Sequence, residues 1–258
     1  MSEIYLPEIS REIQREVLVK HGINEALLAI RYNFEQNANP LNNLPYHNQE
    51  HTRRVIRRTT SILRAIQSVD PFLVKKEDIE LGQLASVYHD IVQEWEEVGG
   101  KRKRFIGENE RKSAEMALSF MDRVNKSDDI FSDTDKLIVK EAIEVTIPGF
   151  DQKLGTVTQP FLSSESSPIT IAVALADIGS CGIDGPSIFL GEGDALFREE
   201  NLDILRTLGE GVQNLTPEQR ESFRERMLNW SKFQLRFVEG RQALLESDLS
   251  GIPQPAKD

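Results

Sequence analysis

The stretch LGQLASVYHD, from Leu81 to Asp90, decides the fold class, because its apolar residues recur at the three- and four-residue spacing of a helix that packs against a core. This helix is predicted to begin at Asp78. It ends on His89 and Asp90, two residue types that bind metal ions. The residues predicted to face the core are Ile79, Leu84, Val87 and Ile91.

Helical spacing continues on both sides of this stretch, and the predicted fold class is all-α. An N-terminal helix is expected to stop at Gly22, and another to start near Tyr46, after Pro45. The charged stretch 95–107 and the Gly-, Ser-, Thr- and Pro-rich stretch 148–168 are expected to be loops. Further helices are predicted at Asn109–Arg123, Asp133–Val145, Ile169–Ile178, Asp194–Leu208 and Pro217–Leu245.

The 258 residues contain no repeat and no clear linker, so residues 1–250 are predicted to form one domain and residues 251–258 a flexible tail. The net charge of −11 argues against a nucleic-acid polymer as partner. A single cysteine, Cys181, and the lack of a leader or of a long apolar stretch favour the cytoplasm and no membrane partner. A homo-oligomer is left open.

The chain has four histidines, and three of them fall in two compact motifs. His47 and His51 are four residues apart, a spacing that places both on one face of a helix. His89 is followed directly by Asp90. Imidazole and carboxylate together suit Mg²⁺ or a divalent first-row ion, which predicts a metal site.

The order of these motifs resembles that of the HD-domain phosphohydrolases, which use one histidine, a later His-Asp pair and a distant aspartate. The resemblance implies a helical bundle with peripheral terminal helices, a motif core over residues 46–178, and His51, His89, Asp90 and Asp177 as metal ligands. Asp177 is favoured as the last ligand because an unpaired carboxylate on so apolar a helix is costly. Asp184, Asp194 and Glu144 compete for that position.

Two further motifs extend the resemblance. YHNQEH, from Tyr46 to His51, is similar to a motif of cyclic-nucleotide phosphodiesterases, which implies that His47 is a general acid. GENERKSAEMA, from Gly107 to Ala117, resembles a group of predicted metal-dependent HD phosphohydrolases, and its Glu110 is expected to orient His47 or a water. The chain departs from that group at residues 92–95, which lack a Tyr-Asp pair, and near Thr146, which has no histidine nearby.

With so few histidines we expect one firmly held divalent ion (Mg, Mn, Fe, Ni, Co or Zn), and any second ion would bind through Asp90 and water. The expected activity is hydrolysis of a phosphoester in a small phosphorylated substrate, with nucleotides among the candidates. A non-catalytic metal- or nucleotide-binding regulatory module is the alternative. A di-iron oxygenase needs more histidine ligands than this chain offers.

Two basic clusters are candidates for binding the substrate phosphate. Arg54, Arg57 and Arg58 form the first, which would otherwise be a solvated helix face. The run KRKR, from Lys101 to Arg104, forms the second, and its other interpretation is an exposed loop.

Overall fold

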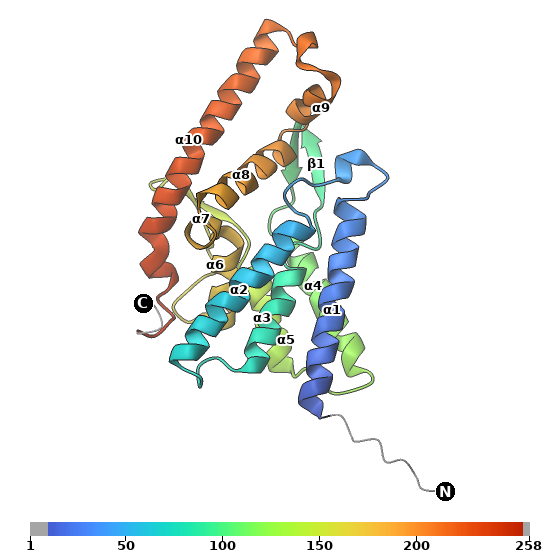
Figure 1. Ribbon diagram of the computed structural model, residues 1–258, viewed down its shortest axis with the longest axis vertical. Coiled ribbons are helices and arrows are strands. Elements are labelled where there is room, and N and C mark those ends of the chain that lie inside the picture. Colours follow the sequence, from blue (N-terminus) through green and yellow to red (C-terminus); the bar gives the residue numbers. More distant parts are fainter. Residues whose placement is uncertain (1–9, 255–258) are drawn as a thin grey trace, which may run out of the picture.

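The computed structural model describes residues 10–254, and within them ten α-helices account for most of the chain (Figure 1). Two short 3-10 helices and two small antiparallel hairpins complete the secondary structure of this part. The predicted all-α class is confirmed. Within residues 10–254, no helix combines the length and the apolar character needed to cross a membrane.

The core forms around α3 (Lys76–Tyr88), the helix predicted from LGQLASVYHD. Every residue from Leu84 to Tyr88 is buried, because this helix packs against five others. Its apolar residues therefore face neighbours on all sides, as expected of a central helix. The five neighbours are α1 (Arg11–Phe34), α2 (Gln49–Val69), α4 (Glu108–Asn125), α5 (Asp133–Glu144) and α6 (Pro168–Ile178).

The start of α2 differs from the prediction. Asn48 caps the helix, because its side-chain oxygen accepts from the backbone N–H groups of Glu50, at 2.9 Å, and His51, at 3.1 Å. The helix therefore begins at Gln49, and His47 precedes it. His47 and His51 therefore do not share a helix face, as the sequence had predicted, and tertiary packing places His47.

The N-terminal helix does not stop at Gly22, as the sequence suggested, but runs unbroken as α1 from Arg11 to Phe34. Gly22 lies against the ring of Phe120 on α4, and a Cβ at this position would stand 2.4 Å from the nearest ring carbon. The glycine therefore permits a close helix contact and does not end the helix.

Both predicted loops contain hairpins. In the first, β1 (Trp95–Val98) pairs with β2 (Lys101–Arg104), and the turn uses Gly99 and Gly100, whose φ angles are +59° and +77°. In the second, β3 (Gly149–Asp151) pairs with β4 (Thr156–Thr158). The stretch 169–173, rich in β-branched residues, lies in α6 and is helical.

The C-terminal third forms a second layer beside the core, with the long α10 on the side opposite α1 (Figure 1). The predicted helix over 194–208 is divided at Asn201 into α8 and α9. Ile252, inside the predicted tail, is buried in the core, and residues 255–258 lie outside the described residues. The elements of this layer are α7 (Ser180–Ile183), α8 (Pro186–Glu200), α9 (Leu202–Glu210) and α10 (Pro217–Asp248); the 3-10 helices are η1 (Pro40–Asn42) and η2 (Val212–Asn214).

Candidate metal centre

Four side chains from three core helices meet in one cluster: His51 near the start of α2, His89 and Asp90 at the end of α3, and Asp177 at the end of α6. One nitrogen or oxygen atom of each lies within 4.8 Å of those of the other three. The structure thus brings together the four residues that the sequence predicted as ligands. The cluster can hold a metal ion.

The spacing of the cluster fits a metal. The Nε2 atom of His89 lies 3.0 Å from Asp90 Oδ2 and 3.6 Å from Asp177 Oδ1, and that of His51 lies 3.4 Å and 3.5 Å from the same two oxygens. Ligand atoms about 2.1 Å from a shared ion lie roughly 3 to 3.5 Å from one another in a tetrahedral site. These four nitrogen–oxygen distances are therefore close to those that a shared ion would give.

The unpaired nitrogens also fit a metal. The Nδ1–H of His89 donates to the carbonyl oxygen of Ser86 at 2.7 Å, which leaves the Nε2 lone pair directed at the cluster. His89 Nε2 and both ring nitrogens of His51 are buried and make no hydrogen bond to any of the residues described. Buried polar atoms are rarely left unpaired, so these nitrogens are available to bind a metal ion.

The charges of the cluster favour a cation. Burial alone would lower the pKa of His51 and of His89, yet both pKa values are raised, because Asp90 and Asp177 stand beside the rings. Burial likewise would raise the pKa of Asp90 and Asp177, yet the histidines hold both pKa values well below their usual range. Positive charge between these four groups is therefore stabilised.

The three competitors for the last ligand position have other partners. Asp184 pairs with Arg57 and Arg58, Asp194 lies 3.0 Å from Arg198, and Glu144 lies 3.7 Å from Lys140. Asp177 alone among the four candidates belongs to the cluster.

Glu199 on α8 holds His47, and this residue was missed from the sequence. One carboxylate oxygen contacts His47 Nδ1, and the other accepts from the backbone N–H groups of Tyr46, at 2.8 Å, and His47, at 3.0 Å. Burial alone would raise the pKa of Glu199, but His47 and these N–H groups lower it to about 2. No local motif marks Glu199, because its partner lies 152 residues earlier.

Glu110 lies near His47 without holding it. Its Oε2 accepts from the N–H of Gly107 at the start of α4, and its Oε1 lies 3.7 Å from Arg104 Nη2. Burial raises the pKa of this carboxyl group. Glu199, and not Glu110, contacts His47, and the other role predicted for Glu110, the orientation of a water, stays a prediction.

Arg104 at the end of β2 is the arginine beside the cluster. Its Nη1 contacts His47 Nε2. The same Nε2 atom lies 3.7 Å from Asp90 Oδ2. Its guanidinium is drawn toward the carboxylates of Asp90, Glu199 and Glu110, which raise its pKa although burial alone would lower it. The run Lys101–Arg104 is therefore a strand that faces the site, and not merely an exposed loop.

The arginines of α2 lie elsewhere. Arg58 is fully buried and donates to Asp184 and to Glu192, each at 2.7 Å. Arg57 pairs with the same Asp184, and Arg54 lies 3.3 Å from the same Glu192. None of the three lines the cavity described next, so their predicted contact with substrate has no support in the geometry.

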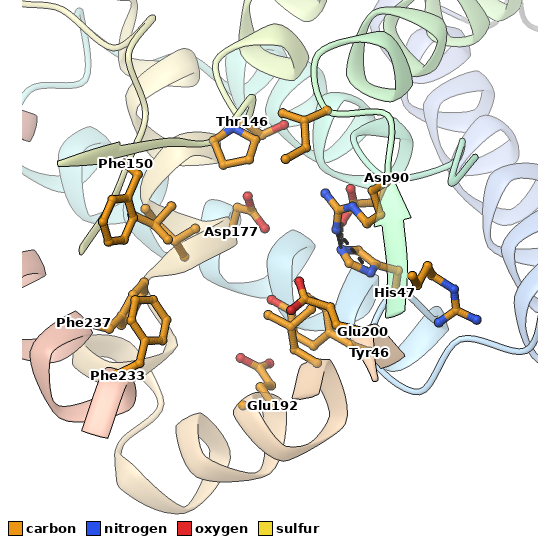
Figure 2. A pocket seen from close by; sticks show the side chains of 18 of the residues that line it. Tyr46, His47, Asp90, Thr146, Phe150, Asp177, Glu192, Glu200, Phe233 and Phe237 are labelled. Carbon is orange, nitrogen blue, oxygen red and sulfur yellow. Dashed lines mark hydrogen bonds and ion pairs between the residues drawn. The ribbon is translucent and has the colours of Figure 1, made fainter. Parts of the chain in front are cut away.

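The cluster opens into a cavity of about 810 Å³. Asp90, Asp177, His47 and Arg104 line one end, and aromatic rings line the other (Figure 2). This volume falls within the usual range for sites that bind small molecules.

None of three comparisons with known proteins gives a match: no family model, no curated protein and no solved structure matches this chain.

Proposed function

We propose that the protein is a metal-dependent phosphohydrolase of the HD type, which cleaves a phosphoester in a small substrate. One observation carries the proposal: the four side chains that can hold a metal ion lie at one end of a large cavity, directly beside His47 and Arg104. This combination provides for the three needs of the reaction, namely activation of water, protonation of the leaving group and neutralisation of the phosphate.

His51, His89, Asp90 and Asp177 would hold one divalent ion. Such an ion, when bound, supplies Lewis acidity to a water molecule and to a phosphoryl oxygen. The chain itself fixes the ligand orientation, because the Ser86 carbonyl keeps the proton of His89 on Nδ1.

His47 is proposed to donate a proton from Nε2 to the departing oxygen. Glu199 binds the opposite nitrogen, Nδ1, and thereby fixes the ring with Nε2 directed toward Asp90. Arg104 contacts Nε2 in the free protein. A substrate phosphate would attract Arg104 as its counter-charge, and that shift would free Nε2 to carry the proton.

The contact between Arg104 and His47 also favours a second candidate, a regulatory module that binds a metal or a nucleotide without turnover. In that case Arg104 would keep occupying the proton-donating nitrogen after a ligand binds. The two candidates differ in whether the bound phosphoester is cleaved.

Hydrolysis of bis(4-nitrophenyl) phosphate and of 4-nitrophenyl phosphate, measured with Mn²⁺, Mg²⁺ and Ni²⁺, tests the proposal. We expect turnover by the wild type and a loss of about 100-fold or more in Asp90→Asn. Asp194→Asn, an exposed carboxylate on α8, is the matched control and keeps its activity. The proposal fails if the wild type binds metal yet is as inactive as Asp90→Asn with every ion.

The leaving group tests the role of His47. A proton donor matters most for a basic leaving group, so we expect His47→Ala to slow hydrolysis of phenyl phosphate about 100-fold or more, and of 4-nitrophenyl phosphate much less. Equal losses for both esters would show that His47 only supports the metal or the fold.

A further inference from the structure

The end of the cavity opposite the metal cluster is aromatic (Figure 2). Five rings line it, and they contact one another at centroid distances of 5.4 to 6.4 Å to form one aromatic wall. None of the five is fully buried, so each keeps surface that a ligand can contact. The aromatic wall consists of Phe150 from β3, Phe189 from α8, and Trp230, Phe233 and Phe237 from α10.

One carboxylate stands beside this wall. Glu192 follows Phe189 by three residues on α8, a spacing that places both side chains on one face of the helix. The carbonyl oxygen of the next residue, Gly193, accepts from Trp230 Nε1 at 3.0 Å, which brings α10 and its rings up to this turn of α8. Figure 2 shows the side chain of Glu192 extending from α8 into the cavity.

The carboxylate of Glu192 is fixed in place, and one of its oxygens is open. Glu192 is only 6% exposed, and its Oε1 accepts from Arg58 at 2.7 Å and from Arg54 at 3.3 Å. Both arginines also pair with a second carboxylate, that of Asp184 or of Glu50, so they do not fully neutralise Glu192. Its Oε2 accepts no hydrogen bond from residues 10–254, yet it is not among the atoms closed off from solvent. This oxygen can therefore meet a ligand in the cavity.

The basic groups of the cavity lie elsewhere. In the described part of the chain, every lysine or arginine that lines the cavity belongs to β2. One of them, Arg104, contacts His47 beside the metal cluster. The second carboxylate that α8 presents to the cavity, Glu200, is close enough to Arg104 and Lys101 for their charges to act on it. The cavity is therefore positive along β2, whereas the charged group at the aromatic wall is the carboxylate of Glu192.

We propose that the aromatic wall and Glu192 bind a positively charged nitrogen, so that the substrate is a phosphoester whose organic part carries an ammonium group. Aromatic rings attract a cation through their negative faces, and the carboxylate adds a full opposite charge. A neutral apolar group could cover the rings but would leave Glu192 Oε2 desolvated and without a partner. The inference rests on the proposed function for the placement of the phosphate at the metal end.

Binding of choline tests the cation site without turnover. Its neutral isostere, 3,3-dimethylbutan-1-ol, has the same shape with carbon in place of the charged nitrogen. The ligands are added to ¹⁵N-labelled protein with Mg²⁺ present throughout, so that choline does not compete for an empty metal cluster. The chain has two tryptophans, and of these Trp230 lines the cavity whereas Trp95 does not. The indole N–H signal of Trp230 therefore reports on the aromatic wall, and that of Trp95 is an internal reference.

We expect choline to shift the Trp230 signal in a saturable way and to bind about tenfold more tightly than the isostere, because the two ligands differ only in charge. Equal affinities would show that the wall accepts neutral apolar groups, and would overturn the inference. So would a Trp230 signal that choline leaves unchanged.

Variants locate the site. Glu192→Gln keeps an oxygen that can accept from Arg58 but removes the charge, so it should abolish most of the preference for choline over the isostere. Phe233→Leu should weaken choline binding severalfold. Glu239→Gln is the matched control, because Glu239 is exposed on α10 and lies outside the cavity. A folded Glu192→Gln variant that keeps the full preference would overturn the assignment of Glu192, and the wild-type comparison decides the proposal if a variant does not fold.

The two proposals can fail separately. If choline is preferred and no phosphoester is cleaved with any metal, the cation site stands and the hydrolase does not. If phosphoesters are cleaved and choline binds no more tightly than its isostere, the hydrolase stands and the cation site does not.

Discussion

Glu199 contacts the imidazole of His47 at Nδ1, and its second oxygen binds the backbone of Tyr46 and His47. One carboxylate from α8 therefore fixes both the ring and the main chain of a residue that precedes its helix. Since Glu199 is fully buried, the pairing contributes to stability as well as to the site.

Glu199→Gln should lower stability in a pH-dependent way. The folded-state pKa of Glu199 is lowered to about 2, below its ordinary value of 4.5, so its contribution is fully present above pH 4.5 and is lost as the pH falls towards 2. A shift of this size corresponds to roughly 3 kcal/mol in the free energy of unfolding. Urea unfolding at several pH values should show the wild-type advantage shrinking below pH 4.5. Glu239→Gln, at an exposed position on α10, serves as control. An advantage of equal size at pH 6 and pH 3 would contradict the assignment.

Asp177→Asn should reduce metal binding. The substitution removes one of the four ligands and the negative charge that offsets the ion. We expect less Mn²⁺ or Zn²⁺ to remain after dialysis, as measured by elemental analysis, and a smaller rise in Tm on adding metal. Asp194→Asn, an exposed carboxylate, should match the wild type. Equal metal retention by Asp177→Asn and the wild type would remove Asp177 from the ligand set.

Gln93 should tune the metal affinity although it is not a ligand. Its Nε2 donates to Asp90 Oδ1 at 2.8 Å, which leaves Asp90 Oδ2 facing the histidines. Gln93→Leu should weaken metal binding about 10- to 100-fold, the usual effect of losing such a supporting contact. Gln83→Leu, which removes a contact between Gln83 and Thr60, is the control. Competition with a fluorescent chelator measures the affinity, and an unchanged value would show that Asp90 needs no such support.

Arg58 and Arg57 should differ in their effect on stability. Arg58→Ala leaves the buried carboxylates of Asp184 and Glu192 without their main partner, which should cost about 3 to 5 kcal/mol in the free energy of unfolding. Arg57 is more than half exposed, so Arg57→Ala should cost less than about 1 kcal/mol. Chemical unfolding tests both. If Arg58→Ala raises KM and leaves stability unchanged, the predicted phosphate contact of α2 is the better explanation.

The sequence by itself determined the helical class, and its resemblance to the HD motifs indicated the four candidate ligands. Helical spacing is a local property, so the apolar pattern of residues 81–90 predicted the central helix and the position of His89 and Asp90 at its end. Asp177 could be singled out because an aspartate on so apolar a helix needs a partner. The sequence did not reveal that Gly22 lies within a helix. A glycine is needed there because the ring of Phe120, on another helix, lies against it.

Only the tertiary structure decided what surrounds the cluster. The partner of His47 is Glu199 and not Glu110, and the arginine at the site is Arg104 and not one of those on α2. The aromatic wall likewise gathers rings from β3, α8 and α10. These contacts join residues far apart in the chain, and they form because α8 packs against β2 and α10 packs against β4 and α8. No periodic pattern within a segment encodes that packing, whereas an aspartate on a strongly apolar helix, such as Asp177, can be recognised from the segment itself.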